Sequence, residues 1–391
     1  MASSDEAEAR NMMASQDNAQ RRIEFANTLR GIAALCVLTM HYTGIFWTSH
    51  EAVADLIHAP VLPEQFAFPV YLRWLHLTVP QFNWGAFGVA LFFMVSGFVI
   101  PFSLRNVTWR GFLVGRFFRI VPLYMAGFSV TLLAIWLAGR YFDVPWPFSF
   151  KEAAIHYLPG LREFFGMASI DGIVWTLEIE IKFYLICALA LALFRRGSIW
   201  VFAIPAALAA CEFYMIRNGF SQAAILPIPF LIFMFIGVVF HYLRLGALSA
   251  ERALFLGAGL FFGFSVLLGQ AIPGLASMAW TYGFAVLTFA FAASFPQLFQ
   301  RTRVADFFAD ISYPLYVVHG VAGYAALRVL LDLGVKAWIS LIIVTAAAIG
   351  IAWVLHVAIE MPSHDFGKRL AARLRRPIVP LPRPVAPLPA V

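Results

Sequence analysis

The chain is organised as a series of long apolar runs separated by short polar segments. About 20 consecutive apolar residues suffice for an α-helix to cross the hydrocarbon core of a bilayer. We expect ten such runs, at residues 31–48, 85–104, 120–139, 172–193, 198–216, 224–243, 253–271, 275–295, 311–331 and 337–359. The pattern therefore predicts an all-α polytopic membrane protein with about ten transmembrane helices.

The composition argues against a soluble or nucleic-acid-binding protein. Of the 391 residues, 61% are hydrophobic and 13% are charged, and the mean hydropathy is +0.80, whereas soluble proteins carry about 25% charged residues. The net charge of +7 would suit nucleic acid, but the basic residues punctuate the spans instead of forming one patch. We therefore expect the lipid bilayer as a partner, and no nucleic acid.

The distribution of Lys and Arg predicts the orientation in the membrane. Cytoplasmic segments are enriched in these residues, and most of the 28 fall on one side if the N-terminus is inside. We expect both termini in the cytoplasm, with a polar segment at 1–22, a membrane domain at 23–366 and a basic, proline-rich tail at 367–391. The first apolar run is long enough to be a retained span, so we expect no cleaved signal peptide.

Two ionisable residues interrupt the first span. Arg30 and His41 are 11 residues apart, which is about 1100° of helical turn, so their side chains point within about 20° of each other. Arg30 lies at the cytoplasmic edge, and His41 then lies near the midplane of the bilayer. Ionisable groups at that depth mark functional sites, although a histidine can also serve only as a hydrogen-bonding partner of a neighbouring helix.

The fourth span carries three charged residues. Glu178 and Lys182 are four residues apart and are expected to pair on one helix face. Glu180 points about 200° away from Glu178 and lies at the depth that His41 reaches from the other side. A carboxylate beside an imidazole fixes its tautomer and raises its basicity, which suits a general base. We expect a structural ion pair for Glu178 and Lys182, and a catalytic role for Glu180.

Arginines gather at the cytoplasmic end of the third span. Arg116 and Arg119 are three residues apart and share a face if the segment is helical. With Arg30 and Arg110 they form a cationic cluster at the cytoplasmic surface, and guanidinium groups suit phosphates. The same arginines would also serve as positive-inside anchors or as contacts to anionic lipid, and their spacing does not distinguish the two functions.

Small and polar residues interrupt two further spans. Ser96 and Gly97 lie in the middle of the second span, where small residues let helices approach closely; no base is evident beside Ser96 in the sequence. His319 is about eight residues into the ninth span, another midplane position, and Pro314 is expected to kink that helix. The three cysteines all fall in predicted helices, so we expect no disulfide framework.

These features together resemble the acyltransferase-3 family of membrane-bound acyltransferases. The resemblance rests on motifs in the family's order: FANTLRGIAALCVLTMH, FFMVSGFVI, RFFRIVPLY, VWTLEIEIKFYL, and then ISYPLYVVHG with IEMPSHDFGKRL. One motif departs from the family: many members have adjacent acids in the fourth span, whereas Ile181 follows Glu180 here. A role of the second acid cannot be transferred. Some members carry a fused hydrolase-like domain, which we do not expect because the chain ends soon after the tenth run.

The resemblance implies an enzyme that moves an acyl group, usually acetyl from cytoplasmic acetyl-CoA, to a hydroxyl of an extracytoplasmic carbohydrate. His41 would be the catalytic histidine, and Arg30, Arg116 and Arg119 would bind CoA. The pore would be lined by Ser96, Gly97, Glu178 and His319. We expect acetyl-CoA as co-substrate, no metal, a glycan acceptor, and a multi-pass location in the inner (plasma) membrane.

Two other functions fit the same residues. A transporter or flippase would use His41 and Glu180 as a proton relay and the arginines to bind an anionic substrate. It predicts solute flux without thioester consumption. A non-catalytic membrane partner of a glycan-assembly complex predicts that the loss of His41 changes only stability.

Overall fold

The computed structural model describes residues 24–77, 82–105, 107–300 and 302–374. The described residues form helices and connecting loops, without strands. The predicted N-terminal segment 1–22 and most of the proline-rich tail lie outside the described residues.

Helices of very different length make up the bundle. The first span is Glu24–Thr48, which includes a π-helical turn, η1 (His41–Ile45), and α2 (Phe46–Thr48). The others, in chain order, are α3 (His50–Ile57), α4 (Val70–Leu77), α5 (Trp84–Val99), η2 (Ile100–Leu104), α6 (Trp109–Phe142), α7 (Phe150–His156), α8 (Leu161–Phe164), α9 (Val174–Leu189), α10 (Leu191–Arg195), η3 (Ile199–Phe202), α11 (Ala203–Arg217), α12 (Gln222–Ile225), α13 (Pro227–Arg244), α14 (Ala250–Ala271), η4 (Pro273–Leu275), α15 (Met278–Ser294), η5 (Pro296–Phe299), α16 (Arg303–Asp310), α17 (Ser312–Val318), α18 (Val321–Asp332), α19 (Ala337–Leu355), η6 (His356–Glu360) and α20 (Met361–Arg373).

Within the described residues, seven helices are long and apolar enough to cross a membrane, or eight if the bent pair α17–α18 is one span. Each of the ten predicted runs contains a helix, but α15 has 17 residues and α9 has 16, about 24–26 Å of helix against a core of about 30 Å. The all-α polytopic membrane fold is confirmed, whereas the count of ten and the side of the termini stay predictions.

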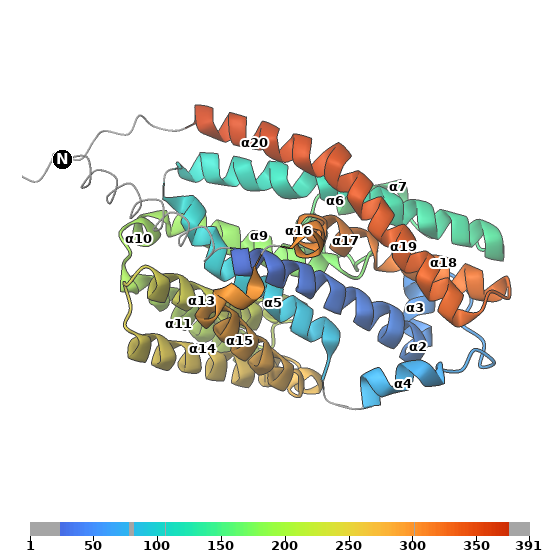
Figure 1. The fold of residues 1–391 in the computed structure, drawn as a ribbon, viewed down its shortest axis with the longest axis horizontal. Helices are drawn as coiled ribbons and strands as arrows, with labels where there is room; N and C mark the ends of the chain where they lie inside the picture. Colours follow the sequence, from blue (N-terminus) through green and yellow to red (C-terminus); the bar gives the residue numbers. More distant parts are fainter. Residues whose placement is uncertain (1–23, 78–81, 106, 301, 375–391) are drawn as a thin grey trace, which may run out of the picture.

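The two longest helical segments lie side by side at one face of the bundle (Figure 1). Helix α6 has 34 residues, and the run through α19, η6 and α20 has 37, so each is about 50–55 Å long and exceeds the bilayer core. Gly367 permits their close approach, because a Cβ there would lie 2.5 Å from the Phe118 Cβ. The predicted boundary at residue 367 therefore falls inside α20.

The ninth predicted span is broken, but not where proline predicts it. Helices α17 and α18 meet at 56° across His319 and Gly320. Pro314 lies in the first turn of α17, where the missing amide would have no helical partner in any case. The bend at Gly320 instead sets the direction of α18, which brings Tyr324 back toward the first span.

Candidate functional site

His41 occupies a special turn of the first span. It begins the π-helical turn η1, and such turns occur often at functional sites. Its Nδ1 lies 2.6 Å from the hydroxyl oxygen of Tyr324, and the two rings stack with their centroids 5.6 Å apart. The imidazole is therefore held in one orientation by a residue from α18.

A second histidine completes this cluster. The ring of His319 is perpendicular to that of His41, with centroids 4.8 Å apart. Its Nδ1 lies 2.9 Å from the Leu315 carbonyl oxygen, so Nδ1 carries the proton and Nε2 is an acceptor. That Nε2 is buried and has no hydrogen-bond partner among the described residues. The Tyr42 hydroxyl donates a hydrogen bond to the His319 backbone carbonyl at 2.9 Å, which fixes the connection between α17 and α18 to the first span.

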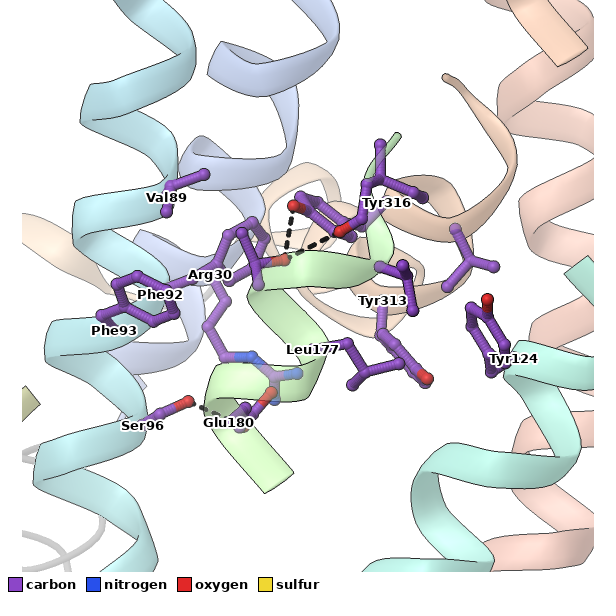
Figure 2. A pocket seen from close by; sticks show the side chains of 14 residues that line it. Arg30, Val89, Phe92, Phe93, Ser96, Tyr124, Leu177, Glu180, Tyr313 and Tyr316 are labelled. Carbon is purple, nitrogen blue, oxygen red and sulfur yellow. Dashed lines mark hydrogen bonds between the residues drawn. The ribbon is translucent and has the colours of Figure 1, made fainter. Parts of the chain in front are cut away.

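A cavity of about 60 Å³ lies between the first span, α5, α9 and α17 (Figure 2). Its polar lining includes Arg30, Ser96, Glu180 and Tyr316. The Tyr316 ring lies 5.7 Å from the His319 ring, so the cavity borders the histidine pair. The remaining lining side chains are Val89, Phe92, Phe93, Tyr124, Ile173, Val174, Thr176, Leu177, Tyr313 and Val317.

Glu180 is the polar centre of this cavity. The sequence predicts that its carboxylate lies beside His41, but its hydrogen bonds go to other residues. Its Oε1 accepts hydrogen bonds from the Ser96 hydroxyl at 2.9 Å and from the Tyr184 hydroxyl at 2.7 Å. The Arg30 guanidinium points toward the Glu180 carboxylate (Figure 2). The partners of His41 are instead Tyr324 and His319, because the bend after α17 brings α18 to the first span. The catalytic role of Glu180 stays a prediction.

Arg116 and Arg119 lie on one face of α6, three residues apart as the sequence predicts. The Arg116 guanidinium lies over the Tyr184 ring at 5.2 Å and donates to the Ser103 hydroxyl at 2.8 Å. Because Tyr184 also bonds Glu180, Arg116 is coupled to the cavity through one shared tyrosine. This arrangement connects Arg116 to the cavity that Arg30 lines.

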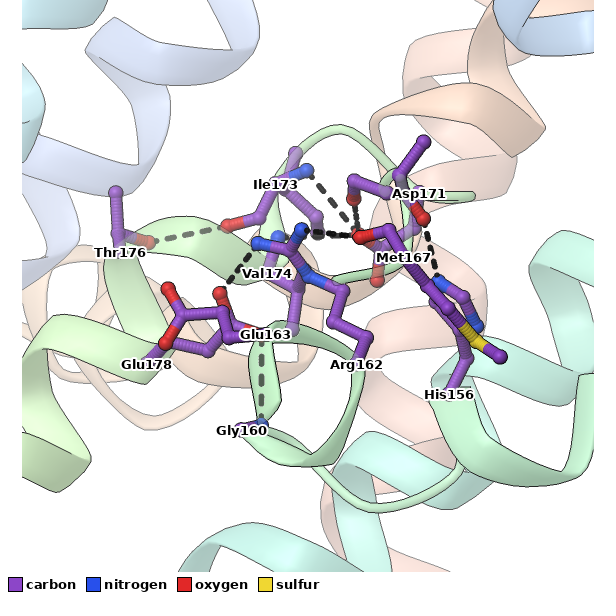
Figure 3. A network of polar contacts seen from close by, with 12 residues as sticks. His156, Gly160, Arg162, Glu163, Met167, Asp171, Ile173, Val174, Thr176 and Glu178 are labelled. Carbon is purple, nitrogen blue, oxygen red and sulfur yellow. Dashed lines mark hydrogen bonds and ion pairs between the residues drawn. The ribbon is translucent and has the colours of Figure 1, made fainter. Parts of the chain in front are cut away.

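The predicted ion pair between Glu178 and Lys182 is wrong. The Glu178 carboxylate pairs with Arg162 (Figure 3). Lys182 pairs with Glu163, which, like Arg162, belongs to α8. The Gly160 amide adds a hydrogen bond to Glu178 at 3.4 Å. A loop that folds back over α9 offers charged partners that helix spacing cannot reveal. Glu178 therefore fastens this loop and is not among the cavity-lining residues.

Gly97 also does not line the cavity; it faces α13. A Cβ at Gly97 would lie 2.0 Å from the Met234 carbonyl oxygen, and one at Gly237 would lie 2.4 Å from the Met94 carbonyl oxygen. The two glycines therefore let α5 and α13 touch backbone to backbone. Ser96, one residue earlier, is directed into the cavity, as Figure 2 shows.

Sequence reasoning missed the tyrosines of the site. Tyr324, Tyr184 and Tyr316 supply partners to His41, Glu180 and His319 respectively. Tyrosine is ordinary at membrane interfaces, so composition does not single these residues out. The only local signal is Tyr184, which lies four residues after Glu180 and therefore on the same face.

The comparison with protein families decides the classification. Residues 23–357 match the family described as an acyltransferase domain, the acyltransferase-3 family. The chain belongs to this family. The match covers most of the chain and supports membrane acyltransferase activity.

A curated protein is similar to part of this chain. Nodulation protein 10 of Rhizobium leguminosarum bv. viciae is 30% identical over 154 residues, which are 34% of this chain and 42% of that protein. The chain thus spans less than half the length of the curated relative that it matches. No solved structure matches the chain.

Proposed function

We propose that this protein transfers an acyl group, in particular acetyl, from acyl-CoA at the cytoplasmic face to a hydroxyl of an extracytoplasmic carbohydrate. The observation that carries the proposal is the environment of His41: a π-helical turn inside an apolar span, with Nδ1 2.6 Å from the Tyr324 hydroxyl oxygen. An oriented imidazole in a water-poor setting is suited to general-base catalysis.

In this proposal the Tyr324 oxygen accepts a hydrogen bond from Nδ1–H, which leaves the lone pair of Nε2 free. The acceptor hydroxyl gives its proton to Nε2 as its oxygen attacks the thioester carbonyl carbon. The carbon–sulfur bond then breaks, and the CoA thiolate takes the proton back from the imidazolium. His319 keeps its own proton on Nδ1, bound to the Leu315 carbonyl, so its Nε2 is available to accept a hydrogen bond from a substrate hydroxyl.

The donor would be bound by the arginines, with the phosphates of CoA at the cytoplasmic end of α6. Arg116 and Arg119 share one face there, and Arg30 lies beside Glu180 in the cavity (Figure 2). Glu180 would position Arg30 and the Ser96 hydroxyl instead of acting on His41, because Glu180 accepts its hydrogen bonds from Ser96 and Tyr184. The protein would act in the inner (plasma) membrane with both termini in the cytoplasm.

The test uses full-length protein in liposomes with labelled acetyl-CoA and a panel of glycan acceptors. The release of CoA and the transfer of label to each acceptor are measured. His41→Ala should lower the rate by about 10²–10⁴-fold, the usual contribution of a general base. Tyr324→Phe should lower it by about 10–100-fold, since a hydrogen bond to a group that becomes charged contributes about 1.5–3 kcal/mol.

His356→Ala is the matched control, because His356 also begins a π-helical turn but pairs with Glu360. It should leave the rate unchanged. Equal rates for wild type and His41→Ala would remove His41 from the chemistry. Solute flux without CoA release would instead favour the transporter.

A further inference from the structure

A second cavity lies where α6 ends, away from the one that Glu180 lines. Its volume is about 340 Å³, within the range of about 300–1,000 Å³ typical of small-molecule sites. The side chains that can recognise a ligand there are His58, Trp136, Arg140, Asp143 and Trp146. Helices α3 and α18 lie at this same end of the bundle (Figure 1).

The backbone around this cavity is unusual. Among the described residues, His58 and Asp143 are the two non-glycine residues with positive φ, at 48° and 55°. Each follows the last residue of a helix, α3 and α6 respectively, and both line this cavity. Left-handed backbone at non-glycine residues costs free energy and clusters at ligand sites. Both residues are the C-caps of their helices, where a left-handed residue is common, and they fix the two chain turns that border the cavity.

Two charged groups of the cavity are available to bind a ligand. Neither the Asp143 carboxylate nor the Arg140 guanidinium forms a hydrogen bond or ion pair within the described part of the chain. Burial lowers the pKa of His58, although the nearby charge of Asp55 acts to raise it. A neutral imidazole offers one hydrogen-bond donor and one acceptor. A carboxylate, a guanidinium and a neutral imidazole together match a ring of hydroxyl groups.

The aromatic groups supply a flat apolar surface beside these polar groups. Trp136 and Trp146 are 49% and 43% exposed, and Trp146 is flanked by Pro145 and Pro147, which restrict the backbone. A rigid surface loses little conformational entropy on binding. A lipid phosphate would suit Arg140 but would be repelled by Asp143, whereas a neutral sugar is compatible with both.

Helix α18 connects this cavity to His41. Tyr324 contacts His41, and Arg328, four residues later, places its guanidinium 4.5 Å from the centre of the Phe142 ring. Four residues are about 6 Å of helix, and Phe142 precedes Asp143 directly. Helix α18 thus contacts both His41 and Phe142, the residue that precedes the cavity-lining Asp143.

We propose that this cavity binds one sugar unit of an oligosaccharide acceptor, a different unit from the one that is acylated at His41. This inference rests on the proposed function and specifies its acceptor as longer than a monosaccharide. Trp136 and Trp146 pack against the apolar face of the sugar ring. Asp143, Arg140 and His58 bind its hydroxyl groups.

The test measures binding of cellotetraose, chitotetraose, xylotetraose and a rhamnose-containing tetrasaccharide, with the matching monosaccharides, to full-length protein in nanodiscs. At least one tetrasaccharide should bind more tightly than its monosaccharide. Trp146→Ala should weaken that binding roughly tenfold, the upper end of one aromatic contact. Asp143→Asn, which keeps a residue tolerant of positive φ, should weaken it as well.

Trp338→Ala is the matched control, since Trp338 is 52% exposed and opens α19, the helix that follows α18. It should bind like wild type. The proposal is overturned if no tetrasaccharide binds, if Trp146→Ala and Asp143→Asn both bind like wild type, or if Trp338→Ala weakens binding as much as Trp146→Ala. Tetrasaccharide binding that depends on Trp146, without any consumption of acetyl-CoA, would support the cavity and reject the acyltransferase. Acyl transfer that depends on His41, with a KM for the oligosaccharide that Trp146→Ala leaves unchanged, would support the acyltransferase and reject the sugar site in this cavity.

Discussion

The contact between α5 and α13 gives a sharp prediction for Gly97→Ala. The added Cβ would lie 2.0 Å from the Met234 carbonyl oxygen, whereas carbon–oxygen contacts between helices are about 3.3–3.6 Å. The helices must therefore separate by more than about 1 Å, because the obstructing atom is backbone and cannot rotate away.

Overpacking of this kind costs about 1–3 kcal/mol of folding free energy. Because the obstacle is backbone, we expect Gly97→Ala to cost about 3 kcal/mol. At about 2 °C per kcal/mol for a large chain, the melting temperature should fall by about 6 °C. The separation also moves Ser96, whose hydroxyl bonds Glu180 at 2.9 Å, so acyl transfer should weaken at temperatures where the protein is still folded.

The assay measures thermal unfolding in detergent by circular dichroism. Acetyl-CoA consumption is measured on the same samples. Gly259→Ala is the matched control, because a Cβ there meets nothing within 4 Å and alanine favours a helix by about 1 kcal/mol over glycine. Gly237→Ala should behave like Gly97→Ala, since its Cβ would lie 2.4 Å from the Met94 carbonyl oxygen. Equal melting temperatures for Gly97→Ala and Gly259→Ala would refute the close-packing argument.

Three further predictions concern charged groups. Arg162→Met should destabilise the protein by about 3–5 kcal/mol, because it leaves the fully buried Glu178 carboxylate without its cation; an unchanged melting temperature would contradict this. Glu212→Met should raise the melting temperature, since both Glu212 carboxylate oxygens are buried without a partner among the described residues, and a lower melting temperature would show that the carboxyl group is needed. The Ser149 amide and hydroxyl lower the pKa of Glu152, so this contact stabilises α7 above the ordinary pKa of about 4.3 and is lost as the pH falls through the lowered value. Amide exchange in α7 should accelerate over that range, and Glu152→Gln should abolish the dependence.

The sequence by itself determined the membrane class, the helical segments and several important positions. Hydropathy accumulates along about 20 neighbouring residues, so it can be read without knowledge of what packs against a helix. The same local reasoning placed Arg30, Ser96 and Glu180, which line one cavity. It also marked His41 and His319, whose rings lie 4.8 Å apart.

Only the tertiary structure decided which groups are partners. Glu178 pairs with Arg162 and not with Lys182, because a loop folds back over α9. His41 meets Tyr324 because the chain bends by 56° around Gly320. Helical spacing fixes directions only within one unbroken helix, whereas partner choice depends on where separate helices and loops meet.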